Sequence, residues 1–363
     1  MNLNGASKGE LPVSNAVFDG VIAALCTWFV GGLYLDGWAH QHIAKLDTFF
    51  TPWHAMLYSG FFALAGTLGL TALWNRRRGY PLTRALPVGY EWSFLGVLIF
   101  LVGGLGDMIW HRLFGIEANL EALLSPMHLL LALSTTLILT GPLRAAWHRT
   151  DAHGWAALWP MLVSLTLLLS VLTFFTQYAH PFASTMAAEP HRPNTAIFGS
   201  LTDRGLARVR FFEQALGLIS IQLQTALLMG VILLAVRRWH LPLGSLILLL
   251  GLNITFLTLM RDKAYSGNPL DTGAFPLIAV AVLGGMAADL LLWRLRPSAA
   301  RRAAFRLFAF AVPTILYGLY FLALWLTGGG VWWSIHLWAG GIGMAGVVGL
   351  LMSFLVVPPL VKD

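Results

Sequence analysis

The sequence has little charge and almost no cysteine. Only 11% of its 363 residues are Asp, Glu, Lys or Arg, whereas a soluble domain carries about 25%. The single cysteine, Cys26, excludes a disulfide bond within the chain. Residues 1–15 are polar and lack the basic start and small-residue cleavage site of a signal peptide, so we expect no removed leader. The scarcity of charge excludes an ordinary soluble domain.

Long apolar runs take the place of charge. Hydrophobic residues make up 57% of the chain, and the mean hydropathy is +0.72. Runs of about 20 apolar residues, the length that crosses the hydrocarbon core of a bilayer, recur along the sequence. This pattern predicts an all-α, polytopic transmembrane helical bundle of about ten spans, with residues 1–363 forming a single membrane domain. The predicted spans are 16–38, 52–74, 91–113, 126–147, 155–178, 209–236, 242–261, 275–293, 303–326 and 333–357.

The basic residues predict the orientation of the chain. They are more frequent in the loops that follow even-numbered spans, which the positive-inside rule places in the cytoplasm together with both termini. We therefore expect a plasma membrane protein, in a bacterium an inner membrane protein. The net charge of +7 does not indicate nucleic acid, because the basic residues cluster in a few loops, and the expected partner is the lipid bilayer. The cytoplasmic residues would be Arg76, Arg77, Arg78, Arg84, Arg144, Arg149, Arg237, Arg238, Arg294, Arg296, Arg301, Arg302 and Arg306.

Two outer loops repeat one pattern. The first hairpin contains "LDGWAH" and then "LDTFFTPWH", and the second contains "GDMIWH" and then "LEALLSPMH". Each has Asp-x-x-x-His, followed by an acid, three residues, Ser or Thr, Pro, any residue and His. Only the loop length differs, by three residues. We interpret residues 16–74 and 91–147 as repeated helical hairpins, which leaves six spans over 155–357.

The spacing brings a carboxylate and two imidazoles together in each hairpin. Residues four apart lie on one face of a helix, so Asp36 and His40 point the same way, as do Asp107 and His111. A Ser or Thr before a Pro is typical of a helix start. Thr51-Pro52 and Ser125-Pro126 therefore place a histidine in the first turn of each returning helix. The predicted ligand sets are Asp36, His40 and His54, and Asp107, His111 and His128.

Two histidines and a carboxylate favour a transition metal. Imidazole suits copper, zinc and iron, and the same set forms the facial triad of non-haem iron oxygenases. Asp47 and Glu121 are candidates to hold a histidine in one tautomer by a hydrogen bond. The alternative for the six residues is a hydrogen-bonded network at the membrane interface. For the two acids, the alternative is a favourable charge near a helix N-terminus.

The repeat also predicts where the two sets lie. Both should sit at the same depth, near the outer face of the membrane, and a local pseudo-symmetry axis should relate them. Because each hairpin supplies a complete set, we expect two separate sites. A single centre would need two ions about 3.5–4 Å apart, and sequence spacing alone leaves that arrangement open.

The strings "DGWAH" and "DTFFTPWH" resemble the C subunit of the copper membrane monooxygenases, the particulate methane and ammonia monooxygenases. The resemblance covers residues 36–60 and, more loosely, 100–130. It implies that Asp36, His40 and His54 bind copper. It also implies a second intramembrane site at Asp107, His111 and His128, with Asp107 in place of the family's asparagine. The chain has more predicted spans than that subunit and no soluble copper-binding domain.

From these observations we expect a membrane copper-binding protein that oxidises a small apolar molecule with dioxygen. Partner subunits or further copies of the chain would be its protein partners. Two alternatives stay open at this stage. One is a protein for copper uptake, storage or delivery, and the other is a zinc-type membrane hydrolase that uses metal-bound water. Zinc and iron remain alternatives to copper because the ligand types suit all three.

Overall fold

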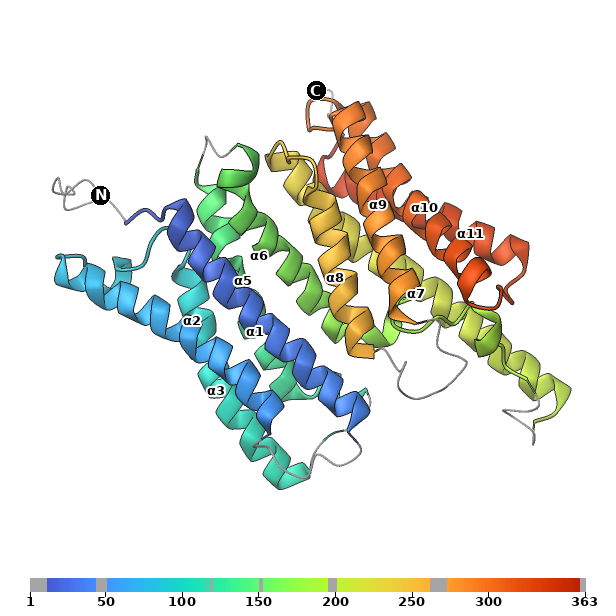
Figure 1. Cartoon of the computed structure of the whole chain (residues 1–363), viewed down its shortest axis with the longest axis horizontal. Helices are drawn as coiled ribbons and strands as arrows, with labels where there is room; N and C mark the ends of the chain where they lie inside the picture. Colours follow the sequence, from blue (N-terminus) through green and yellow to red (C-terminus); the bar gives the residue numbers. More distant parts are fainter. Residues whose placement is uncertain are drawn as a thin grey trace. The chain divides into compact units, whose positions relative to one another are not determined.

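The computed structural model of the chain is helical (Figure 1). It describes residues 12–43, 51–115, 117, 120–149, 153–194, 201–261 and 273–359. The described residues form eleven α-helices and three short 3-10 helices, and the only strand-like pairing among them is an isolated bridge between Ala188 and Val331. The predicted all-α fold is confirmed.

Each of the ten predicted spans corresponds to one helix in the described residues. Nine of these helices are long and apolar enough to cross a membrane, so the chain is a polytopic membrane protein. The predicted span 242–261 corresponds to α8 (Ser245–Arg261), which has only 17 residues and is shorter than the others. The nine are α1 (Ala16–His42), α2 (Pro52–Arg77), α3 (Glu91–Phe114), α5 (Pro126–Trp147), α6 (Gly154–Phe175), α7 (Asp203–Arg238), α9 (Ala274–Leu295), α10 (Arg302–Thr327) and α11 (Ile335–Val356).

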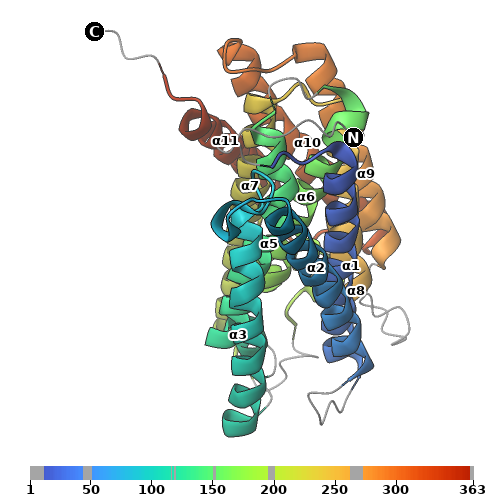
Figure 2. The ribbon, with the colours of Figure 1, turned by 90° about the vertical axis from the view of Figure 1, so that its left-hand side faces the viewer.

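The helices group into two compact units, Met1–Val171 and Leu172–Asp363, within the membrane domain that the sequence predicts. In the first unit α1 packs closely against α2 and α3 against α5, which gives two antiparallel hairpins. The hairpins meet where α1 contacts α5 and α2 contacts α3. Figures 1 and 2 show that α1 and α3 end at the same end of this unit. The short helix α4 (Glu121–Leu124) precedes α5 there.

Glycine allows the hairpin helices to approach closely. A Cβ atom at Gly32 on α1 would lie 2.7 Å from the Cα of Leu57 on α2. At Gly103 on α3 it would lie 3.0 Å from Cδ2 of Leu131 on α5. Small residues permit such crossings between membrane helices, where van der Waals packing replaces the hydrophobic drive of soluble proteins.

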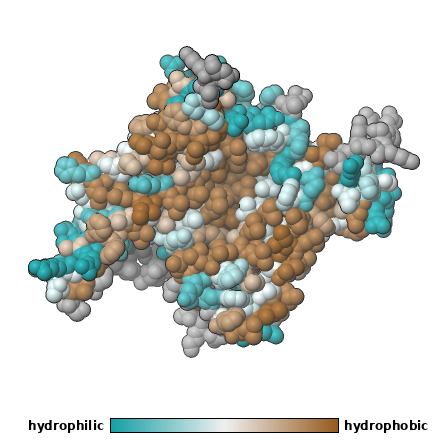
Figure 3. All heavy atoms as spheres, turned by 180° about the vertical axis from the view of Figure 1, so that it is seen from behind, coloured by the Kyte–Doolittle hydropathy of each residue, from teal (hydrophilic) through white to brown (hydrophobic). Residues whose placement is uncertain are grey.

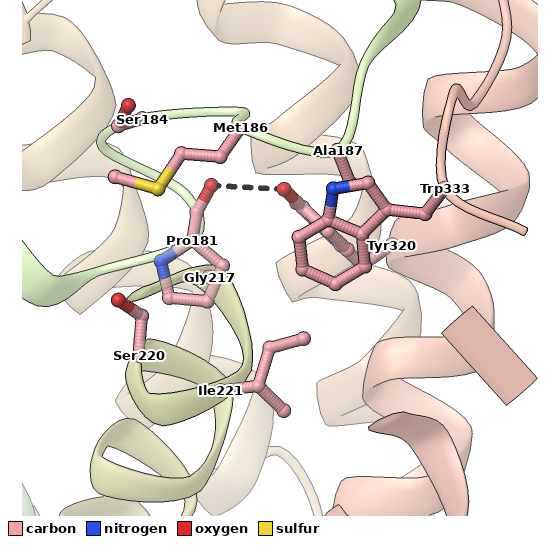
Figure 4. A pocket seen from close by; sticks show the side chains of 9 residues that line it. All are labelled: Pro181, Ser184, Met186, Ala187, Gly217, Ser220, Ile221, Tyr320 and Trp333. Atoms are coloured by element: carbon pink, nitrogen blue, oxygen red, sulfur yellow. Dashed lines mark hydrogen bonds between the residues drawn. The ribbon is translucent and has the colours of Figure 1, made fainter. Parts of the chain in front are cut away.

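The second unit contains α7 to α11 and the segment that precedes α7, which includes the 3-10 helices Gln177–Ala179 and Glu189–His191. In Figure 4 the hydroxyl of Tyr320 donates to the carbonyl of Pro181, 3.1 Å away, beside a small cavity that Met186 and Trp333 also line. The space open to the centre of a water molecule is about 10 Å³, which holds about one water. This cavity is too small for an organic substrate.

The outer surface of the helices is apolar. Large side chains such as Leu70, Leu105, Phe275 and Trp325 are more than half exposed, and hydrophobic residues cover much of the face seen in Figure 3. Patches of this extent are rare on soluble monomers. A lipid bilayer is therefore the environment that these helices fit.

Candidate metal centres

The first predicted set comes together where α1 ends and α2 begins. Asp36 and His40 lie one turn apart on α1, with 3.7 Å between Oδ2 and Nε2. Thr51 caps α2 by accepting a hydrogen bond from the backbone N–H of His54 at 3.1 Å, and Pro52 is the first helical residue. This start points His54 back at α1, so that its Nδ1 lies 3.3 Å from Oδ1 of Asp36. The capping pattern predicted from sequence is present.

The second set has the same construction on α3 and α5. Oδ2 of Asp107 lies 3.4 Å from Nε2 of His111, and Oδ1 lies 3.2 Å from Nε2 of His128. Ser125 caps α5 by accepting from the N–H of His128 at 3.3 Å. The two sets differ at the second histidine: His54 faces its aspartate through Nδ1, whereas His128 does so through Nε2.

Equivalent contacts relate the two hairpins throughout. At each close helix crossing, the glycine four residues before the aspartate (Gly32 or Gly103) meets the leucine three residues after the second histidine (Leu57 or Leu131). The centroids of the two histidine rings lie 5.8 Å apart in the first set and 5.7 Å apart in the second. Phe29 and Phe100, each seven residues before its aspartate, touch one another with ring centroids 5.2 Å apart. Contact between equivalent residues is expected around a local two-fold axis. Such an axis would exchange α1 with α3 and α5 with α2, and accordingly α1 contacts α5 and α3 contacts α2.

The ligand atoms of each set are spaced as around one ion. Two atoms that each lie about 2.1 Å from a metal are about 3.0–3.4 Å apart at octahedral or tetrahedral angles. The four aspartate–histidine contacts measure 3.2–3.7 Å, and within each set one ligand atom per residue lies within 4.8 Å of the others. The residues therefore fit a metal ion without rearrangement of the helices.

The aspartates are buried and incompletely bonded. Asp36 is 8% exposed and Asp107 is 2% exposed. Among the residues that the structure describes, no partner makes a geometrically good hydrogen bond to Oδ1 of either, although a histidine nitrogen is near. A buried carboxylate oxygen left in this way costs free energy unless a cation neutralises it. A shared metal ion supplies that cation.

The two sets are distinct but electrically coupled. Each is complete by itself, while the charge on Asp36 interacts with both Asp107 and His128 of the other set. Tyr58, one turn after His54 on α2, stacks at 6.4 Å on the ring of His54 and interacts electrostatically with both aspartates. Its hydroxyl reaches α3, where it would lie 3.2 Å from a Cβ atom at Gly104. Tyr58 therefore lies near both sets.

Sequence reasoning missed Glu117. In the loop after α3 its Oε2 lies 2.9 Å from Nδ1 of His111. Of the two acids that were predicted to orient histidines, Glu121 is exposed in α4 and has no ion pair in the described part of the chain, and Asp47 lies outside the described residues. The signal available for Glu117 was its place in the second loop, which is three residues longer than its counterpart in the repeat.

Two other histidines lie apart from the metal sets. His42 stacks on Trp38 with ring centroids 4.8 Å apart, and its Nδ1 lies 2.8 Å from the carbonyl of Trp38. His180 lies in the second unit, before α7, where Phe182 donates its backbone N–H to Nδ1 at 3.1 Å. Burial, helped by the charge of Arg261, lowers the pKa of His180 to about 3. Neither histidine belongs to a described group of metal-ligand type.

Comparison with known proteins gives no match: no family model, no curated protein and no solved structure matches the chain. The resemblance to the copper monooxygenase C subunit therefore stays a prediction. The functional argument rests on the geometry of the two aspartate–histidine sets.

Proposed function

We propose that the chain is a membrane protein that binds two copper ions, one in each hairpin, and uses them to oxidise a small apolar molecule with dioxygen. The ligands would be Asp36, His40 and His54 at the first site and Asp107, His111 and His128 at the second. Zinc and iron are the other metals that suit these ligands. An external reductant would supply the two electrons that the reaction with dioxygen needs, and partner subunits or further copies of the chain would be its protein partners.

One observation carries this proposal. Twice, in equivalent hairpins, two imidazoles face a buried aspartate at ligand-to-ligand distances, and one carboxylate oxygen has no hydrogen bond of good geometry among the described residues. Ionisable groups in membrane segments are costly and are usually functional. Repetition of the full set makes a purely packing role a poor account, since a packing role does not require the same three ligand types twice.

The residues around the sets suit oxidation of an apolar molecule. Copper would supply an ion that gains and loses one electron, and the two aspartates would balance its charge in an apolar setting. Capping by Thr51 and Ser125 fixes the second histidine of each set on a rigid helix start. Behind them, the rings of Phe61 and Phe100 stack at 4.3 Å, and Phe100 also contacts Tyr58. Phe61 and Phe100 are buried, so the packing around Tyr58 is apolar.

Copper delivery is the second candidate, and the exposure of His40 favours it. The side chain of His40 is 35% exposed, whereas that of Asp36 beside it is 12% exposed. A ligand that reaches solvent allows an ion to be exchanged with an external donor or acceptor. A delivery protein should lose copper from the first site to a soluble chelator within the time of an assay. An oxidase should retain it through turnover.

The decisive experiment measures metal content and the copper spectrum. Purified protein in lipid nanodiscs is loaded with Cu²⁺, washed and analysed for bound metal and for nitrogen couplings by electron paramagnetic resonance. We expect two ions per chain, each with two nitrogen ligands. His40→Ala should remove the first ion and leave the second, and His111→Ala should do the reverse. His42→Ala is the matched control, because His42 is two residues from His40 and lies outside the set.

Three outcomes separate the alternatives. Loss of both ions in His40→Ala would indicate one two-metal centre. Loss of neither, with the spectrum unchanged, would favour the interfacial hydrogen-bond network and contradict the proposal. Loading by zinc alone under competition would favour the hydrolase.

A further inference from the structure

Glu117 is a largely buried acid that contacts the predicted ligand His111 at the ring nitrogen that faces away from Asp107. Its Oε2 lies 2.9 Å from Nδ1 of His111, and its side chain is 12% exposed. Both carboxylate oxygens are buried, and neither has a hydrogen bond of good geometry within the described ranges. Within the described ranges, the contact with Nδ1 of His111 is therefore what compensates for burying this charge.

The contact favours the tautomer of His111 that carries its proton on Nδ1. A neutral imidazole has one N–H donor and one acceptor nitrogen. Nδ1 faces two acceptors, the carboxylate of Glu117 and, at 3.4 Å, the carbonyl of Gly115. The proton is therefore favoured on Nδ1. Nε2, on the other edge of the ring, then presents its lone pair to Oδ2 of Asp107 at 3.4 Å. Two acceptors at this distance repel one another unless a cation lies between them.

We propose that Glu117 is a positioning residue of the second metal site. It holds His111 in the tautomer whose Nε2 binds the ion, and it adds a second negative charge near the site. This inference rests on the proposed metal function. Carboxylates that receive the far N–H of a metal-bound histidine raise its basicity and fix its ring, and their loss typically weakens metal binding 10–100-fold.

Glu117 acts through His111 and not as a ligand of the same ion. It lies against Nδ1, while the other members of the set, Asp107 and His128, converge on the Nε2 side. One ion cannot be bound by both edges of an imidazole ring. The rival account places a proton where the metal would be, so that His111 is an imidazolium between Asp107 and Glu117. Under that account Glu117 has no bearing on metal affinity.

The test compares two glutamates that are four residues apart. In a His40→Ala background, which leaves only the second set, Glu117→Gln and Glu121→Gln are titrated with Cu²⁺ in nanodiscs. Glu121 is exposed and is the control for the loss of one negative charge in this loop. We expect Glu117→Gln to weaken copper binding 10–100-fold and Glu121→Gln to leave it within about twofold. Glu117→Asp, which keeps the charge but shortens the reach, should fall between them.

A spectroscopic readout separates positioning from stability. The remote nitrogen of a copper-bound imidazole is visible in electron spin echo spectra, and its coupling reports the hydrogen bond at that nitrogen. Glu117→Gln should change this coupling in the copper-loaded protein, and Glu121→Gln should not. Equal affinities and couplings in the two variants would overturn the role of Glu117 while leaving the metal site intact. If Glu117→Gln does not fold, an unchanged coupling and affinity in Glu117→Asp would overturn it. Absence of copper in the His40→Ala parent itself would instead overturn the proposed second site.

Discussion

At the scale of single residues, the buried carboxylates of this chain are stabilised in different ways. Asp19 on α1 accepts from the hydroxyl of Tyr90 at 2.6 Å and pairs with Arg149 at 2.5 Å. Asp289 on α9 accepts the backbone N–H groups of Leu246 and Ile247 at the start of α8, at 3.2 and 3.1 Å. Each of these groups has a cation or helix-end donors as its partner.

Among the described residues, Asp36 and Asp107 have neither kind of partner. Their neighbours are histidines, which become cations only when protonated, and each aspartate keeps one oxygen without a good hydrogen bond in the described structure. Asp19 also keeps one oxygen without a good hydrogen bond, but that oxygen faces the guanidinium of Arg149, whereas only imidazoles face Asp36 and Asp107 in the described structure. This contrast supports metal binding more strongly than the residue types alone.

A prediction at the residue scale concerns His180 and pH. Its pKa is about 3 in the folded protein because of burial and Arg261, against about 6.5 in an unfolded chain. Between these values the unfolded state binds more protons, so stability should fall as the pH falls from about 6.5 towards 3, by up to about 1.4 kcal/mol per pH unit. Above pH 6.5 the term is constant.

Thermal unfolding in detergent from pH 7.5 to 4.5 measures this effect. His180→Gln removes the titrating group, so its unfolding temperature should depend less on pH than that of the original chain. His336→Gln, at an exposed histidine of α11, is the control. Parallel curves for all three proteins would show that His180 is not buried as described.

At the scale of helices, the hairpin crossing sets the site. Gly32 lies one turn before Asp36 on α1 and touches the backbone of α2 beside Leu57. Any side chain at this point moves the helix that carries His54 away from the helix that carries Asp36 and His40. Assembly of the first set therefore depends on a position that offers no ligand.

Gly32→Ala and Gly31→Ala test this dependence as a matched pair. A Cβ at Gly32 would meet backbone atoms at 2.7 and 2.8 Å, whereas a Cβ at Gly31 meets nothing within 4 Å. We expect Gly32→Ala to cost about 1–3 kcal/mol of stability and to weaken copper binding at the first site only. Gly31→Ala should be neutral or slightly stabilising, since alanine favours helix. Equal behaviour of the pair in unfolding and metal titration would contradict the crossing.

The helices and the two sets of three were predictable because each follows from local rules. Bilayer thickness fixes the apolar length of a span, and helical spacing with a Thr-Pro or Ser-Pro start fixes where the ligands point. Helix ends were less predictable. Helix α7 begins at Asp203, six residues before the predicted start at 209, because Thr202 caps a polar first turn that hydropathy does not detect.

Glu117 and Tyr58 could not be predicted for a different reason. Glu117 lies in an irregular loop, where no period relates sequence to direction, and that loop differs in length from its counterpart in the repeat. In the sequence, Tyr58 is one aromatic residue among many in a span. Only the packing of α2 on α3 shows that it lies beside Gly104. Contacts between hairpins depend on the shape of the whole interface, which the sequence pattern of either hairpin alone does not contain.

At the scale of the whole molecule, the orientation in the membrane is the remaining prediction from sequence. The end of α2 carries Arg76 and Arg77, and the loop between α2 and α3 carries Arg78 and Arg84. Both metal sets lie at the opposite ends of these helices. By the positive-inside rule the sets should face the outside of the cell. An outer location would expose the first set, through His40, to metal supplied from outside.

Thiol labelling in intact cells tests this orientation, and the chain suits the method because its one cysteine, Cys26, is buried. Glu121→Cys places a thiol at an exposed position beside the second set, and Leu82→Cys places one at a residue that is 58% exposed in the arginine-containing loop. A membrane-impermeant maleimide should label Glu121→Cys in intact cells and Leu82→Cys only after permeabilisation, while the unsubstituted chain serves as the blank. The opposite pattern would place both sets at the cytoplasmic face, where copper would have to come from an intracellular donor.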